Sequence, residues 1–107
     1  DFNFFVATFE EFIRQCKEKV QDFTLAIQSK DTVKVKLLAH NLKGVAANFE
    51  AVRIAMLAND LDLQARAGNL SQAKGLVAAI ENEIPALERN LAQIKVFQNT
   101  GSQQTGL

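Results

Sequence analysis

Apolar residues recur at steps of three and four along almost the whole chain of 107 residues, and proline occurs only once, at Pro85. This spacing places the apolar side chains on one face of an α-helix. The pattern is interrupted around 29–31, 49–51 and 67–69. It therefore predicts four helices joined by short connections, which make neighbouring helices antiparallel. We expect an all-α fold, an antiparallel up-down four-helix bundle.

Capping residues suggest where the helices begin and end. The first helix is expected over about 1–29, with a possible capping box at Thr8 that would open it after a short lead-in. Asp31 or Ser29 can cap the second helix. Gly68 suits the left-handed end of the third helix. The fourth helix should continue through Pro85 with a kink, because the apolar period stays in phase beyond the proline.

The composition indicates one small domain. We expect residues 1–97 to form it and residues 98–107, rich in Gly, Ser, Thr and Gln, to form a polar flexible tail. Twelve basic and twelve acidic side chains give no excess charge that would favour nucleic acid, and no apolar run reaches the roughly 20 residues of a membrane span. The single cysteine, Cys16, lies on the apolar stripe and is predicted to be a small buried residue. A lone cysteine fits a reducing compartment, so we expect a cytoplasmic protein.

Helical geometry predicts that His40, the only histidine, faces solvent. A step of about 100° per residue from His40 gathers an apolar stripe on the opposite side, made up of Val35, Leu38, Leu42, Val45 and Phe49. The His40 side holds Val33, Lys36, Leu37, Lys43, Gly44, Ala47 and Ala51. A lone histidine is more often a core residue, but this periodicity argues for the exposed face of the second helix.

An exposed imidazole can be a metal ligand, a general base or a nucleophile. A metal site is disfavoured, because there is no second histidine and no acidic residue lies one turn from His40 on the helix. A general base is disfavoured because no nearby carboxylate on the helix would orient the ring. The nucleophile remains. Lys36 and Lys43, each one turn away, favour an incoming anion such as a phosphoryl group.

Small residues beside His40 suggest a surface for another protein. Gly44 lies one turn beyond His40, and a glycine inside a helix costs about 0.5–1 kcal/mol relative to alanine. Such a residue would clear space for a partner's surface, although each residue alone is also compatible with an ordinary solvated face. We expect the partner-binding surface to consist of Val33, Lys36, Leu37, Asn41, Ala47 and Ala51.

The run from Leu38 to Asn48, Leu-Ala-His-Asn-Leu-Lys-Gly-Val-Ala-Ala-Asn, resembles the signature of histidine-containing phosphotransfer (HPt) domains. The similarity extends through Leu57-Ala-Asn-Asp-Leu-Asp and Ala67-Gly68-Asn69 to the Glu-Ile-Pro of the last helix. It covers roughly 31–94. The first helix is similar only as an amphipathic element.

The resemblance implies a four-helix bundle that carries phosphoryl groups. His40 would accept the group from a receiver-domain phospho-aspartate and pass it to the aspartate of another receiver. Lys43 would help to neutralise the phosphoryl group, and Gly44 would give clearance to the partner. The partners implied are response-regulator receiver domains, whose own acidic site would hold Mg²⁺, so no cofactor is expected on this chain. The five glycines are scattered and form no nucleotide loop, so ATP-dependent autokinase activity is not expected.

One position departs from the family pattern. The family commonly has glycine where this chain has Glu50. A carboxylate there could repel the acidic pocket of a partner, or it could select a partner that carries a matching basic group. It could also shift the end of the second helix.

A second hypothesis is a non-catalytic helical interaction or dimerisation module of a sensor kinase, in which His40 stays unmodified. The dimerisation domain of histidine kinases also carries an exposed histidine on a helix. That histidine is usually followed by an acidic residue, where this chain has Asn41. Four helices in one chain favour a monomer over a dimer of helix pairs.

Overall fold

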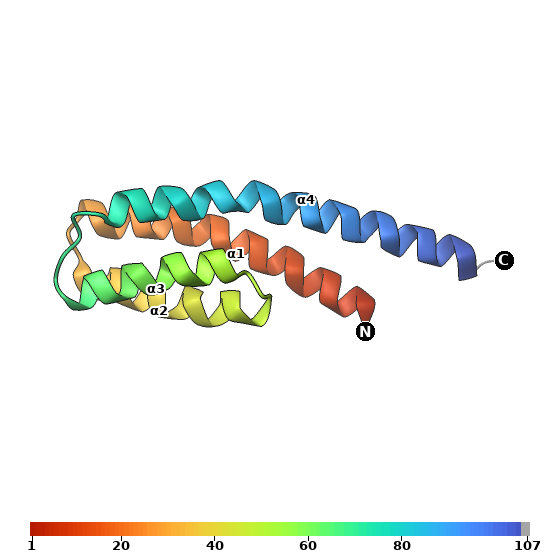
Figure 1. Cartoon of the computed structure of the whole chain (residues 1–107), viewed down its shortest axis with the longest axis horizontal. Helices are drawn as coiled ribbons and strands as arrows, with labels where there is room; N and C mark the ends of the chain where they lie inside the picture. Colours follow the sequence, from red (N-terminus) through yellow and green to blue (C-terminus); the bar gives the residue numbers. More distant parts are fainter. Residues whose placement is uncertain (106–107) are drawn as a thin grey trace.

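The structure, a computed structural model, describes the backbone of residues 1–105 and the side chains of residues 1–97. Its helices are α1 (Phe2–Gln28), α2 (Thr32–Asn48), α3 (Val52–Arg66) and α4 (Ala73–Thr105). Successive helices run in opposite directions (Figure 1). Within the described part, each helix packs against two neighbours, in the cyclic order α1, α2, α3 and α4. The all-α up-down four-helix bundle predicted from the sequence is confirmed.

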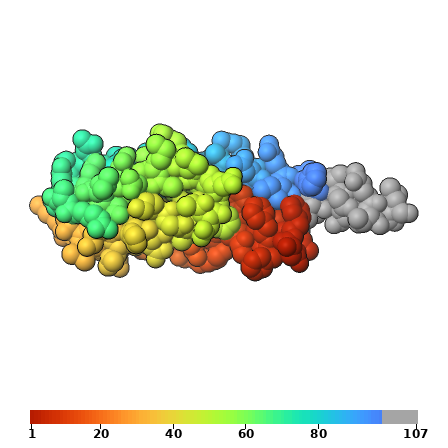
Figure 2. Space-filling model, turned by 60° about the horizontal axis from the view of Figure 1, so that its bottom comes forward, coloured from red at the N-terminus to blue at the C-terminus, as the bar shows by residue number. Residues whose placement is uncertain are grey.

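The two shorter helices form one face of the bundle. Helices α1 and α4 extend beyond α2 and α3 at the end where both chain termini lie (Figure 1). Figure 2 shows α2 and α3, in yellow and green, side by side over one face, with the beginning of α1 exposed beyond them. The α2–α3 face is therefore the surface on which His40, in the middle of α2, is presented.

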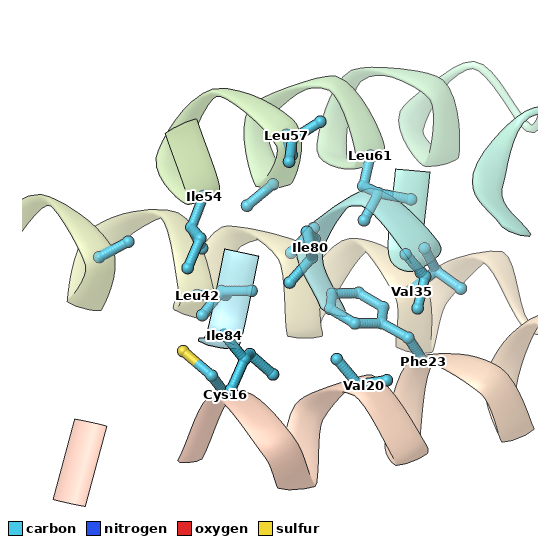
Figure 3. Packing of buried hydrophobic residues seen from close by; sticks show 14 of the residues in the cluster. Cys16, Val20, Phe23, Val35, Leu42, Ile54, Leu57, Leu61, Ile80 and Ile84 are labelled. Atoms are coloured by element: carbon cyan, nitrogen blue, oxygen red, sulfur yellow. The ribbon is translucent and has the colours of Figure 1, made fainter. Parts of the chain in front are cut away.

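A continuous apolar core holds α2 in place. Side chains from all four helices meet between them (Figure 3), and the largest fully buried ones are Phe12, Phe23, Leu42, Ile54, Leu61 and Ile80. Such close-packed side chains fix the rotation of each helix about its axis. Cys16 is fully buried, as predicted, and this burial raises the pKa of its thiol to about 11.

Three of the helices end in the same way, with a residue in the left-handed region. Lys30 follows α1 with φ 56°, Glu50 follows α2 with φ 53° and Gly68 follows α3 with φ 72°. At the end of α2, the N–H of Ala51 donates to the carbonyl of Ala46 at 3.0 Å, and the N–H of Glu50 donates to the carbonyl of Ala47 at 3.2 Å. These paired hydrogen bonds form the Schellman motif, in which glycine is preferred at the left-handed position. The role predicted for Gly68 is confirmed.

The beginnings of the helices confirm one prediction and correct another. Asp31 caps α2, since its carboxylate accepts a hydrogen bond from the N–H of Lys34 at 3.0 Å. The capping box at Thr8 is wrong. Helix α1 already begins at Phe2, capped by Asp1, and the Thr8 hydroxyl donates to a carbonyl within the helix. An acidic N-cap at Asp1 leaves no need for a second start at Thr8.

Helix α4 is longer than the apolar pattern indicates. It continues through Pro85 without a break, as its apolar period predicts, and it runs to Thr105. The sequence predicts a flexible polar tail over 98–107. The backbone of that segment is helical to Thr105, while residues 106 and 107 lie outside the described residues. The flexibility of this segment stays a prediction.

Candidate functional site

His40 lies near the middle of α2, and its side chain is 67% exposed. This exposure agrees with the prediction made from the helical period alone. Its two neighbours along the chain differ in burial: Ala39 is fully buried, whereas Asn41 is exposed. The imidazole is therefore held on the surface by a backbone that the core keeps fixed.

The buried face of α2 differs somewhat from the predicted one. Its fully buried residues are Val35, Ala39, Leu42 and Ala46, whereas Leu38, Val45 and Phe49 are only partly buried. At about 100° per residue, the centre of the buried face is turned by about 50° from the predicted stripe. Because of this rotation, His40 does not point directly away from the core. It leans towards one side of α2, the side on which α3 lies.

A buried carboxylate from α3 lies beneath the histidine. Asp62 is only 3% exposed, and it is the one charged residue that is buried among the described side chains. Its Oδ2 atom lies 3.9 Å from His40 Nδ1 and 3.9 Å from Lys43 Nζ. Its Oδ1 atom accepts a hydrogen bond of 2.9 Å from Nε of Arg66, one turn further along α3. One carboxylate thus lies among two cations and the His40 imidazole.

Lys43 is anchored towards α3 by a second contact. Its Nζ atom donates a hydrogen bond of 3.3 Å to Oδ1 of Asn59, and its side chain is 38% exposed. The ammonium group is therefore held at the edge of the site near Asp62. A cation fixed next to an exposed imidazole stabilises an anion that approaches the ring.

The geometry distinguishes the two ring nitrogens of His40. Nδ1 is the nitrogen on the Asp62 side, and the distance of 3.9 Å between Nδ1 and Oδ2 is too long for a hydrogen bond. Nε2 lies at the far edge of the five-membered ring. The sequence indicates that no carboxylate on the helix of His40 lies near the ring, which is correct for α2, but α3 places the Asp62 carboxylate 3.9 Å from Nδ1.

The predicted partner-binding residues largely share one exposed surface. Val33 and Leu37 are 61% and 60% exposed, and Asn41 and Ala47 are also exposed. Lys36 is half-buried. Ala51 does not lie on α2, since α2 ends at Asn48 and Ala51 is the N-cap of α3, where it packs partly buried against the core, and its part in partner binding stays a prediction. The left-handed turn at Glu50 redirects the chain and removes Ala51 from the exposed face of α2.

Gly44 is exposed, and nothing in the described part of the chain requires a glycine there. A Cβ atom built at this position meets no atom within 4 Å, and the residue lies inside a regular helix. A glycine in this place lowers helix stability without a gain in packing inside the chain. The space above Gly44 is open to whatever contacts His40 from outside.

Two further observations concern the described residues as a whole. No group of three or more His, Cys, Asp or Glu side chains lies close enough to hold a metal ion. No helix in this part of the chain combines the length and the apolar character that crossing a bilayer requires.

Sequence reasoning missed Asp62, Asn59 and Arg66. A signal for Asp62 was present, because it occupies a position on the apolar stripe of α3, with Ala58 four residues before it and Ala65 three residues after it. A charged residue at a core position requires a partner, and an arginine four residues later on the same face supplies one.

The comparisons with known proteins agree with this geometry. A family model described as Hpt domain matches residues 7–90. A crystal structure of histidine-containing phosphotransfer protein B (HptB) from Pseudomonas aeruginosa PAO1 is similar to this chain, with 26% sequence identity and a TM-score of 0.78. That match covers 82% of this chain and 76% of that chain. Comparison with curated proteins gives no match. Since the family model covers most of the chain, including His40 and the residues around it, this chain belongs to the Hpt domain family, and its function is histidine phosphotransfer in a phosphorelay.

Proposed function

We propose that His40 is the phosphoryl-carrying residue, which accepts the group from the phospho-aspartate of one receiver domain and passes it to the aspartate of another. The observation that carries the proposal is a sole histidine, 67% exposed, in the middle of a helix that the core holds in place. HptB, the similar protein of known structure, is by name a histidine-containing phosphotransfer protein.

The transfer step follows from the two ring nitrogens. The lone pair of Nε2 attacks the phosphorus of the aspartyl phosphate in line with the bond to the aspartate oxygen. The new bond joins Nε2 to phosphorus, and the bond that breaks leaves a free aspartate carboxylate on the receiver. The proton on Nδ1 stays in place, so the ring becomes positively charged. Asp62, 3.9 Å from Nδ1, stabilises that charge, and the reverse attack regenerates the neutral ring.

Lys43 and Gly44 serve the same step in different ways. The Lys43 ammonium group, held by Asn59 beside His40, offsets the negative charge of the phosphoryl oxygens. Gly44 leaves room for the receiver surface to come close to the ring. Transfer between two proteins then needs little more than the positioning of reactive groups.

The metal of the reaction belongs to the receiver in this proposal. The one carboxylate beneath His40 already lies between Lys43 and Arg66, and two cations beside it disfavour a bound metal ion. We also propose that the protein acts as a monomer in the cytoplasm, without autokinase activity. One chain supplies all four helices of the core, and the lone buried Cys16 suits a reducing compartment.

The direct test is incubation with receiver domains that carry a ³²P-labelled phospho-aspartate. Label should move to this chain and should be lost in acid while it survives in base, because the N–P bond of phosphohistidine has that stability. An acid-stable label would contradict the assignment. Light scattering serves as a parallel measurement, since a stable dimer that buries the His40 face would instead support the interaction-module hypothesis.

A second prediction concerns Gly44. Gly44→Ala should slow transfer from a receiver about 10-fold or more, because a methyl group would meet the partner, and should raise the free energy of unfolding by about 0.5–1 kcal/mol. Gly75→Ala is the matched control, since Gly75 also lies in a helix with open space around a built Cβ, but far from His40 in the first turn of α4. Equal transfer rates for both variants would show that Gly44 provides no clearance.

A further inference from the structure

A groove runs along the seam between α2 and α3, next to the His40 site. It has a volume of about 560 Å³ and is lined by Lys43, Ala47, Glu50, Val52, Ala55, Met56 and Asn59. The two helices are antiparallel, so Lys43 and Asn59 mark one end of the groove, where they are in hydrogen-bond contact. Glu50 and Val52 mark the other end, at the turn between the helices.

The two ends of the groove carry opposite charges, and the part between them is apolar. Lys43 supplies the positive end beside His40, and Glu50 supplies the negative end. Val52 and Met56 are 64% and 61% exposed, so both offer apolar surface to a partner. A partner that fills this groove must therefore present an apolar side chain together with a group that matches the charge of Glu50.

The Glu50 carboxylate is available to a partner. Within the described residues, no hydrogen bond or salt bridge engages its oxygen atoms, and the neighbouring Arg53 pairs with Glu83 at 3.6 Å. Glu50 also occupies the left-handed position of a Schellman motif, where glycine would be favoured. The chain thus keeps an exposed carboxylate at a position where its backbone is strained.

A receiver that reaches His40 also covers this groove. Asn48, the last residue of α2, lies eight residues beyond His40, which is about 12 Å along the helix at about 1.5 Å per residue, and Glu50 follows two residues later. A standard protein interface covers about 800 Å² per partner, the area of a disc of about 16 Å radius. A docking surface centred on His40 therefore extends to Glu50 when it follows the α2–α3 face shown in Figure 2.

We propose that this groove selects the receiver, and that the preferred receiver presents an apolar side chain against Val52 and Met56 and a Lys or Arg side chain against Glu50. The inference rests on the proposed function, because the partner is the domain that phosphorylates His40. It goes further by assigning partner choice to Glu50, at the far end of the groove from the reactive ring. Because the Glu50 carboxylate has no partner within the described residues, charge complementarity favours a receiver with a basic group at this point over one with an acidic group.

The test compares Glu50→Lys and Glu50→Gly with the unaltered protein, using a receiver domain that labels it. Both variants should raise KM for the phosphorylated receiver, about 3-fold for Glu50→Gly and about 10-fold for Glu50→Lys, with a smaller change in the maximal rate. The difference between the unaltered protein and Glu50→Lys should shrink as salt is raised. Substituting the matching basic residue of the receiver with Glu should restore transfer to Glu50→Lys.

Lys30 provides matched controls, because it has the same left-handed backbone at the opposite end of the bundle. Lys30→Gly and Glu50→Gly should raise the midpoint of thermal unfolding similarly, by about 4 °C or more. Only the Glu50 variant should change KM, and Lys30→Glu should leave KM unchanged. Unchanged KM in both Glu50 variants, with the unaltered protein still labelled, would overturn the groove proposal alone. Failure of every receiver to label the unaltered protein would overturn the proposed function and this inference together.

Discussion

His40→Gln is expected to abolish labelling by phosphorylated receivers while the bundle stays folded. The glutamine amide has no nitrogen lone pair free to attack phosphorus, so the loss should be complete rather than partial. The His40 side chain is 67% exposed and lies outside the core, so the free energy of unfolding should change by no more than about 0.5 kcal/mol.

The measurement combines transfer of ³²P label with thermal unfolding followed by circular dichroism. Lys34→Gln is a suitable control, because it also places glutamine at an exposed position on α2, six residues before His40. The control should keep its full labelling. Label that persists in His40→Gln would show that a different side chain carries the phosphoryl group, and the acid and base stability of that label would identify its class.

The fold could be predicted because it depends on a repeated local pattern. Apolar residues at steps of three and four determine the helices one by one, and short connections leave few ways to pack them. Asp31 and Gly68 marked helix ends correctly because capping depends on neighbouring residues in the chain. Glu50 gave no such signal, since its side chain is not one that favours a left-handed backbone.

The rotation of α2 about its own axis could not be predicted from the sequence with the same accuracy. The predicted stripe counted large apolar side chains, yet the centre of the buried face includes Ala39 and Ala46. An alanine is equally compatible with the surface and with a close helix contact, so its hydrophobicity alone does not place it. The error of about 50° was too small to bring His40 into the core, and for that reason the prediction that His40 faces solvent is confirmed.

Asp62 shows what a single helix cannot reveal. The exposure of His40 follows from α2 alone, but its contact with Asp62 requires the rotation of α2, the rotation of α3 and their antiparallel alignment together. Helical spacing gave no information on which residues of α3 lie opposite His40. The same holds for the hydrogen bond between Lys43 and Asn59.

Replacing Asp62 should separate the activity of the site from the stability of the bundle. A unit charge about 4 Å from the ring is worth about 1 kcal/mol in water and about 4 kcal/mol near a protein surface, and the nearby Arg66 and Lys43 offset part of it. Removing the charge should therefore slow transfer to His40 by about 10-fold, a change of about 1.4 kcal/mol in the activation free energy.

The stability of the bundle should not fall when Asp62 is replaced by an apolar residue, although transfer becomes slower. Apolar replacement of a buried charged group is often neutral or stabilising, because the cost of desolvating the charge disappears. Asp62 is 3% exposed, whereas its partner Arg66 is 54% exposed and can return to water. Asp62→Leu should therefore keep or raise the thermal midpoint while transfer becomes slower. Asp62→Asn should slow transfer similarly with a closer match in shape.

Asp60 supplies the control for both variants, since it is an exposed aspartate on the same helix. Asp60→Asn should transfer at the unaltered rate, which would exclude a general effect of lowering the negative charge of α3. Transfer rates and unfolding curves measured on the same samples decide between two roles for Asp62. If Asp62→Leu and Asp62→Asn fold normally and accept phosphoryl groups at the unaltered rate, the buried carboxylate serves only to hold Lys43 and Arg66. Slow transfer by variants that are equally or more stable would instead show that Asp62 acts in the transfer step. The position would then hold an aspartate for the charge that it places beside the phosphorylated ring, although an apolar residue there would make the bundle more stable.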